Sequence, residues 1–171
     1  LRDYLELVSK SGVDIAVKPQ YVDKLPKLWD GEVRGLLQRV DDHGRLDEFA
    51  EKTSIKHILE RKLSGLSGGE LQRVAICATI LKEADVYFFD EPSSYLDIHE
   101  RMRVVNIIQS LVENGKRIIV IEHDLAILDV LCDLVHIVYG QRAAYGIFTP
   151  PRTTRTAINA YLDGYLNEEN V

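Results

Sequence analysis

The spacing of hydrophobic residues divides the first third of the chain into short helices and one strand. Apolar residues recur at helical intervals over residues 1–12, where Gly12 ends the pattern, and again over residues 31–63. Between these stretches, the continuous apolar run over residues 13–17 predicts a strand, which Pro19 helps to end. We expect a small helical subdomain that follows one strand.

After Gly65 helical and extended patterns alternate. Predicted helices begin near Glu70, near Glu100, at Leu125 and at Thr154. Predicted strands cover residues 86–89, 118–121, 135–139 and 144–148. Apolar strands that alternate with amphipathic helices are typical of a parallel sheet covered on both faces. The sequence therefore predicts an α/β core.

Composition limits the class of protein. With 171 residues, 46% of them hydrophobic, the chain can bury one substantial core. The formal charge of −6 argues against a broad basic face that coats nucleic acid. The two cysteines, Cys77 and Cys132, lie in apolar helical patterns without a CxxC pair and are interpreted as buried thiols. No apolar run approaches the roughly 20 residues of a membrane helix, so we expect a cytoplasmic protein without membrane partners.

Two adjacent acids follow the predicted strand over residues 86–89. Ligands of open α/β sheets gather at the carboxyl ends of strands, which makes Asp90 and Glu91 candidate site residues. In phosphoryl transfer an acid in the first position holds Mg²⁺, usually through water, and the next acid orients or deprotonates the attacking water. A strand that simply leaves the core into a polar loop would show the same pair, so other motifs must decide.

The next strand along the chain also ends in polar residues, Glu122, His123 and Asp124. If the two strands are neighbours, His123 and Glu91 share one rim of the sheet. A histidine there could donate a hydrogen bond to a γ-phosphate or to the attacking water. Because a lone histidine after a strand is more often a turn residue, this interpretation depends on the accompanying motifs.

The most specific signal is the segment Leu66-Ser67-Gly68-Gly69-Glu70-Leu71-Gln72. Ser67 and Glu70 have the spacing of a capping box, which by itself predicts only the start of a helix. Capping does not explain the two glycines. Two residues without Cβ would let a phosphate approach the N–H groups at the positive end of a helix.

With this segment the chain resembles the ABC-type ATPases, whose signature motif has the same form. The other motifs of that class are present in order. Gln20 resembles the Q-loop glutamine, Asp90 the Walker B aspartate, Glu91 the catalytic glutamate, Asp97 the acid of the D-loop over residues 92–97, and His123 the switch histidine.

Three segments resemble more closely the first ATPase domain of the RNase L inhibitor family, the twin-ATPase ribosome-recycling factors of archaea and eukaryotes. They are KPQYVD at residues 18–23, DEPSSYLD at residues 90–97 and VIEHD at residues 120–124. Transporter ATPases usually carry Thr or Ser where Glu122 stands, and they rarely have Tyr95 in the D-loop. The resemblance extends over the whole chain.

The resemblance implies ATP hydrolysis in the intact parent protein, coupled to the splitting of ribosomes by closure of two ATPase domains. Its implied ligands are ATP and Mg²⁺, and its implied partners are the second ATPase domain of the same parent chain, the small ribosomal subunit and a release factor. Glu91 and His123 would be catalytic, with Gln20 and Asp90 holding Mg²⁺ through water. Ser67, Gly68 and Gly69 would contact the γ-phosphate bound by the other domain, and Asp97 would couple the two sites.

The family's P-loop is missing from the 171 residues, because no segment matches GxxxxGK[ST]. We therefore expect an N-terminally truncated piece that, taken alone, neither binds ATP tightly nor hydrolyses it. The family also carries an iron–sulfur cluster in a domain that precedes the first ATPase domain. Nothing in this sequence could ligate such a cluster.

The expected fold class is α/β, a P-loop NTPase-like ABC ATPase domain with a parallel sheet core flanked by helices and an α-helical subdomain. Residues 1–20 would form the end of the N-terminal part of the core, up to the Q-loop, and residues 21–65 the helical subdomain. Residues 66–150 would carry the signature, Walker B, D-loop and switch, and residues 151–171 the C-terminal helix and the start of a hinge.

Three alternatives stay open at this level. The first is the cytoplasmic ATPase subunit of a membrane transporter, against which Glu122 and the Tyr95 D-loop count. The second is a DNA-associated head domain of the chromosome-maintenance type, but residues 20–67 hold no sustained heptads for its long coiled coil. The third is a non-catalytic binding module that keeps the motifs as a surface. The missing P-loop is the only feature that supports it.

Overall fold

The computed structural model describes residues 12–141 and 144–164, which divide by their contacts into the units Leu1–Glu122 and His123–Val171. The helix expected over residues 1–12 lies outside the described residues, apart from Gly12. The division into four parts expected from the sequence stays a prediction. No helix in the described ranges is both long and apolar enough to cross a membrane.

The first unit is built around a three-stranded parallel sheet. Its strands are β1 (Ile15–Lys18), β2 (Val86–Asp90) and β3 (Arg117–Ile121), in the order β1-β2-β3. The predicted neighbourhood of the second and third strands is therefore confirmed, with Asp90 opposite Ile121. Strand β1 is shifted by one or two residues from the predicted range, so that it includes Lys18.

The two long helices of this unit begin at side-chain caps. Helix α5 (Gly68–Leu81) starts after Ser67 in a complete capping box with Glu70, and α6 (Ile98–Glu113) starts after Asp97, which accepts a hydrogen bond from the Glu100 N–H at 3.0 Å. Such caps satisfy N–H groups that have no partner within the helix. Both helices begin about two residues before their predicted starts, because the cap residue rather than the apolar pattern fixes the first turn.

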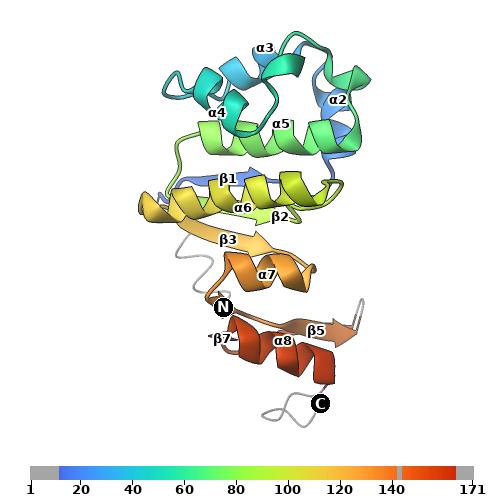
Figure 1. Ribbon diagram of the computed structural model, residues 1–171, viewed down its shortest axis with the longest axis vertical. Coiled ribbons are helices and arrows are strands. Elements are labelled where there is room, and N and C mark those ends of the chain that lie inside the picture. Colours follow the sequence, from blue (N-terminus) through green and yellow to red (C-terminus); the bar gives the residue numbers. More distant parts are fainter. Residues whose placement is uncertain (1–11, 142–143, 165–171) are drawn as a thin grey trace. The chain divides into compact units, whose positions relative to one another are not determined.

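Short helices pack on the outer side of α5 (Figure 1). They are η1 (Val22–Lys24), α2 (Leu25–Leu28), α3 (Val33–Gln38), α4 (Leu46–Lys52), η2 (Lys56–Ile58) and η3 (Leu63–Gly65). Their inward residues, among them Val33, Leu37 and Ile58, are fully buried. The predicted helical character of residues 31–63 is confirmed, although the helices are shorter than the pattern suggested.

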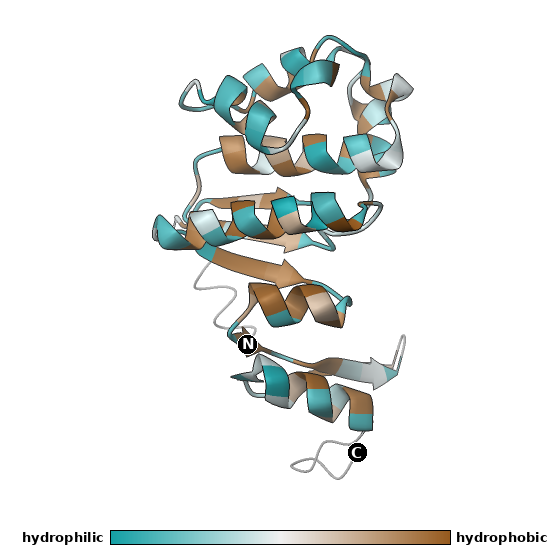
Figure 2. Cartoon of the chain, in the orientation of Figure 1, coloured by the Kyte–Doolittle hydropathy of each residue, from teal (hydrophilic) through white to brown (hydrophobic). Residues whose placement is uncertain are grey.

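The two faces of the sheet differ in burial within this unit. Ala16, Tyr87 and Phe89 lie on a buried face, and α5 packs against β1 and β2. Because side chains alternate along a strand, Ile15, Val17 and Ile119 occupy the opposite face, where they are 44–55% exposed. The strands are largely apolar (Figure 2), as predicted, but the predicted cover on both faces is not seen at these three residues of the unit.

The second unit contains α7 (Leu125–Leu131), β4 (Leu134–Val135), β5 (Val138–Gln141), β6 (Tyr145–Phe148), β7 (Arg152–Thr153) and α8 (Thr154–Asp163). Strand β4 pairs with β7 and β5 with β6, both antiparallel. The single strand predicted over residues 135–139 was wrong: it is interrupted where the Ile137 N–H donates to Thr149 Oγ1 at 2.9 Å. The predicted parallel sheet does not extend to β5 and β6, because their connection is far too short for a parallel crossover.

The two thiols differ in burial. Cys77 is fully buried in α5, and burial raises its pKa to about 12, whereas Cys132 is only partly buried. We expect a thiol reagent at pH 8 to label Cys132 in the folded protein and to spare Cys77 until the protein unfolds, because the thiolate is the reactive form. Mass spectrometry of peptides after timed labelling checks this. Cys132→Ser isolates Cys77, and labelling of native Cys77 at the unfolded rate would contradict it.

The same shift predicts how stability depends on pH. The folded-state pKa of Cys77 lies above its ordinary value of 9.0, so the stabilisation from the buried neutral thiol is complete below about pH 9 and is lost as the pH rises toward 12. In Cys77→Ala the free energy of unfolding should lose this dependence on pH in the alkaline range.

Candidate functional site

The first feature of the candidate site is a contact between the ends of β1 and β2. Gln20 follows β1, and its Nε2 donates a hydrogen bond to Glu91 Oε1 at 3.0 Å. Glu91 follows Asp90, the last residue of β2. The structure therefore brings together the glutamine and the glutamate that the sequence singled out separately, at the carboxyl edge of a parallel sheet where ligands gather.

Glu91 is held by its main chain and by its side chain. Its φ of 48° is in the left-handed region, which is uncommon for a residue other than glycine. Its N–H donates to the carbonyl oxygen of Ile121 at 2.8 Å, and its Oε2 accepts from Ser94 Oγ at 3.1 Å. With Gln20 on the other oxygen, the carboxylate has a fixed orientation.

A buried lysine that the sequence analysis missed lies directly behind these acids. Lys18 has 0% exposure, and its Nζ donates to the carbonyl oxygens of Asp90 at 2.6 Å and Glu91 at 3.1 Å. Burial lowers the pKa of Lys18 to about 8, against the opposing effect of the neighbouring carboxylates of Asp90, Glu91 and Glu122. The available signal was its strand position, which places it on the same face as Ala16.

The signature segment forms the N-terminus of α5. Glu70 Oε2 accepts hydrogen bonds from the N–H and the Oγ of Ser67 at 2.7 and 2.8 Å, and Arg61 pairs with Glu70 at 2.9 Å. The bond from the Ser67 N–H lowers the pKa of Glu70, although partial burial opposes the shift. Ser67 and Gly68 are exposed, so the start of the helix is accessible to a ligand or another domain.

One of the two glycines of the signature segment, Gly69, has a structural reason that the sequence did not reveal. A Cβ on Gly69 would lie 3.0 Å from the carbonyl oxygen of Tyr95, and one on Gly68 would lie 3.5 Å from the Tyr95 ring. Tyr95 itself has a left-handed φ of 65°. Gly69 therefore lets the signature segment and the D-loop pack together, whereas a Cβ on Gly68 would make only an ordinary van der Waals contact. The contact of both glycines with a phosphate stays a prediction.

Further contacts hold the D-loop and the first turn of α6, which follows it. The Oγ of Ser93 donates to Glu122 Oε2 at 2.6 Å, which joins the D-loop to the end of β3. Arg73 of α5 pairs with Glu100 of α6 at 2.9 Å, and their side chains are only 14% and 18% exposed. Asp97 caps α6, and the Glu100 N–H lowers its pKa. The predicted D-loop acid thus has a structural role, while its coupling role stays untested.

His123 is the first residue of the second unit, so its predicted position beside Glu91 stays a prediction. Its neighbour Asp124 caps α7 by accepting from the N–H groups of Ala126 and Ile127 at 3.0 and 3.3 Å. Capping α7 is a sufficient reason for an acid at position 124, so Asp124 needs no role in catalysis.

The donor set fits magnesium. Gln20 and Asp90 supply an amide and a carboxylate at adjacent strand ends, and oxygen is the ligand atom that Mg²⁺ prefers. Among the described residues no group of three or more His, Cys, Asp or Glu side chains could hold a metal ion. Mg²⁺ usually keeps several waters and binds one or two protein groups together with substrate phosphates.

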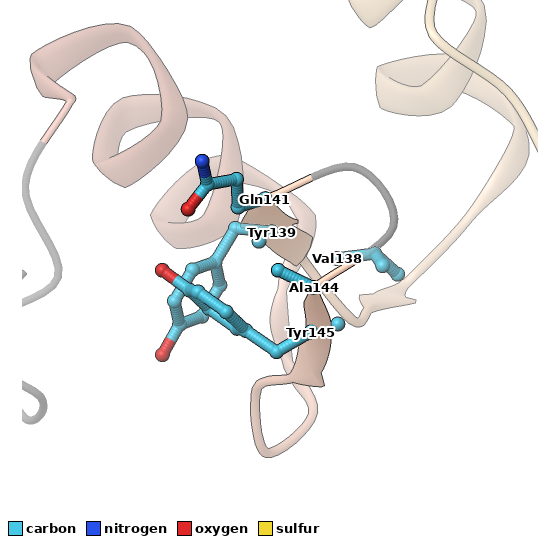
Figure 3. Close-up of a pocket in the computed structure, with 7 residues that line it drawn as sticks. Val138, Tyr139, Gln141, Ala144 and Tyr145 are labelled. Carbon is cyan, nitrogen blue, oxygen red and sulfur yellow. The ribbon is translucent and has the colours of Figure 1, made fainter.

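The second unit has a surface hollow on the β5–β6 hairpin, in which Tyr139 and Tyr145 lie side by side (Figure 3). Gly140 belongs to its lining, and a Cβ there would collide with the carbonyl oxygen of Tyr145 at 2.2 Å. None of the predicted site residues lines it, so we do not assign it to the candidate site.

A family model described as ABC transporter matches residues 6–94. Because this match covers more than half of the 171 residues, the chain belongs to the ABC family of ATPases. The expected ABC ATPase fold is confirmed.

Particular relatives narrow this class. An uncharacterized ABC transporter ATP-binding protein of Methanocaldococcus jannaschii is 50% identical over 171 residues, which are 100% of this chain and 28% of the relative. The archaeal ribosome recycling factor aABCE1, solved with the ribosomal stalk protein aP1, matches with a TM-score of 0.93 and 49% identity, over 100% of this chain and 33% of that one. A structure of an RNase-L inhibitor matches with a TM-score of 0.92 and 50% identity, over 100% and 33%.

These similarities over the whole chain place it in the RNase L inhibitor branch, and the resemblance inferred from residues 18–23, 90–97 and 120–124 is confirmed. The chain spans 28–33% of the length of these proteins.

Proposed function

We propose that this chain is part of an ATP-hydrolysing domain of a cytoplasmic ribosome-recycling factor, in which closure of two ATPase domains splits ribosomes. The observation that carries the ATPase part is the Gln20–Glu91 hydrogen bond of 3.0 Å at the carboxyl edge of the sheet. It supports a carboxylate with a fixed direction at the place where a nucleotide would bind. The ribosomal part is supported by the similarity to the archaeal recycling factor.

In this proposal each residue has a separate task. Glu91 orients or deprotonates the attacking water, and Gln20 and Ser94 hold its carboxylate in position. Gln20 and Asp90 hold Mg²⁺ through water, and the ion would neutralise charge on the phosphates. His123 contacts the γ-phosphate from the switch position.

The second site needs the opposite domain. Ser67, Gly68 and Gly69 present the N-terminus of a 14-residue helix, where partial positive charge favours an anion. We propose that they contact a γ-phosphate held by the P-loop of the other ATPase domain, and that Asp97 couples the two sites. The release factor and the small ribosomal subunit belong to the same proposal.

The 171-residue polypeptide taken alone is expected to show no ATP turnover above background. Without a GxxxxGK[ST] segment it offers no backbone cradle and no lysine for the β- and γ-phosphates. Phosphate release by the purified chain, compared with the same chain carrying Glu91→Gln, checks this. Turnover that the substitution abolishes would contradict it.

The ribosomal part is tested by co-sedimentation of the full-length protein with small ribosomal subunits, with and without a non-hydrolysable ATP analogue. We expect binding that requires the analogue, because nucleotide closes the two domains. Binding in neither condition would contradict ribosome recycling and favour the ATPase of a membrane transporter.

A further inference from the structure

The backbone of Glu91 has to be kept in an unfavourable conformation. A left-handed φ of 48° at a residue with a long side chain persists only when the surrounding structure enforces it. The conformation sets the direction in which the carboxylate leaves the end of β2. Groups that hold the peptide units on either side of Glu91 therefore also set the position of the carboxylate.

Two side chains donate hydrogen bonds to the main-chain carbonyl group of Glu91. Gln72 Nε2 donates to the Glu91 carbonyl oxygen at 2.7 Å, and Lys18 Nζ donates to the same oxygen at 3.1 Å. Lys18 also donates to the Asp90 carbonyl oxygen at 2.6 Å, so it spans two successive peptide units. Lys18 and Gln72 both have 0% exposure, so water cannot easily replace either donor.

The chemistry of Lys18 separates this contact from an ordinary ion pair. Its Nζ reaches the main-chain oxygens of Asp90 and Glu91, although both residues also carry carboxylates. Burying an ammonium group is unfavourable unless it is hydrogen-bonded. A lysine that served only to fill the core here could be replaced by an apolar residue of similar shape without effect on the acids.

We propose that Lys18 and Gln72 form an anchor for the Glu91 main chain and are positioning residues for ATP hydrolysis. The inference rests on the proposed catalytic role of Glu91. Gln72 adds a connection, because it belongs to α5, whose first turn is the signature segment. If contact with the opposite domain moved that helix, the Gln72 side chain would transmit the movement to the Glu91 carbonyl group.

The test uses the full-length protein with Lys18→Met and, separately, Gln72→Met, each of which removes the donor and keeps much of the side-chain volume. Displacement of a reacting group by about 1 Å can cost up to 10²-fold, so we expect kcat to fall by about 10-fold or more while KM for ATP changes by less than about twofold. Lys116→Met is the matched control, because Lys116 binds Glu83 and the Ala84 carbonyl near the opposite end of β2. Its kcat should equal that of the wild type.

A second readout distinguishes positioning from general damage. If the anchor acts through the Glu91 carboxylate, Lys18→Met should cause no further loss in single-turnover hydrolysis when Glu91→Gln is already present. Three results would contradict the anchor. They are multiplying rate losses in the Lys18→Met, Glu91→Gln double variant, an unchanged kcat in both Lys18→Met and Gln72→Met, and an equal loss in Lys116→Met. Should Lys18→Met lack a cooperative thermal transition, Gln72→Met decides. If Glu91→Gln itself leaves turnover unchanged, the proposed function fails instead.

Discussion

Replacing Glu91 by Gln in the full-length protein is expected to lower the rate of ATP hydrolysis by about 10² to 10⁴-fold, the range that a positioned general base contributes. The amide keeps an oxygen for the bond from Gln20 Nε2, which is 3.0 Å long in the structure. Its other end can still interact with Ser94 Oγ. The substitution therefore removes the charge and basicity of the side chain and leaves its position almost unchanged.

Steady-state phosphate release at saturating ATP measures this loss, and equilibrium binding of a fluorescent ATP analogue shows that the nucleotide is still held. Glu48→Gln is the charge-matched control, since Glu48 lies on α4 and pairs with exposed Lys52 at 2.6 Å. It should hydrolyse ATP at the wild-type rate. A Glu91→Gln protein with more than about a tenth of wild-type turnover would contradict the role of this residue as a general base.

Much of the first unit could be predicted because its local signals agree with one another. The apolar runs at residues 86–89 and 118–121 form β2 and β3, and the capping box at Ser67 starts α5 as expected. The predictions were weaker after His123. There, β5 pairs with β6, and a bond from Ile137 to Thr149 interrupts the strand pattern; neither contact leaves a periodic pattern in the sequence.

For the candidate site, the sequence identified the chemical groups but not what holds them. Gln20 and Glu91 were recognised individually, and their contact depends on the pairing of β1 with β2, which joins residues far apart in the chain. The sequence did not identify Lys18 as a buried residue, because a lysine beside Pro19 is typical of the polar end of a strand. In the structure β1 includes Lys18, and the alternation of its side chains places Lys18 on the buried face with Ala16. Similarly, the need for Gly69 comes from the Tyr95 carbonyl, which no local rule could anticipate.

Replacing Ser67 by Arg in the full-length protein is expected to weaken nucleotide-dependent binding to small ribosomal subunits at least about tenfold, as measured by co-sedimentation. A change of this size is typical of the coupling between two binding sites. Ser67 is exposed at the start of α5, and a long cationic side chain there would occupy the place proposed for the opposite γ-phosphate. Loss of the cap alone costs about 1 kcal/mol, which is too little to unfold a typical domain.

Two further variants separate these causes. Ser67→Ala removes the cap without adding bulk and should retain most of the nucleotide-dependent binding. Ser64→Arg adds the same side chain at an exposed position of η3, just before the signature segment, and should bind as the wild type does. Equal loss in Ser64→Arg would show that added positive charge, and not the signature segment, disturbs the ribosomal contact. Wild-type binding by Ser67→Arg would mean that domain closure does not require this end of α5.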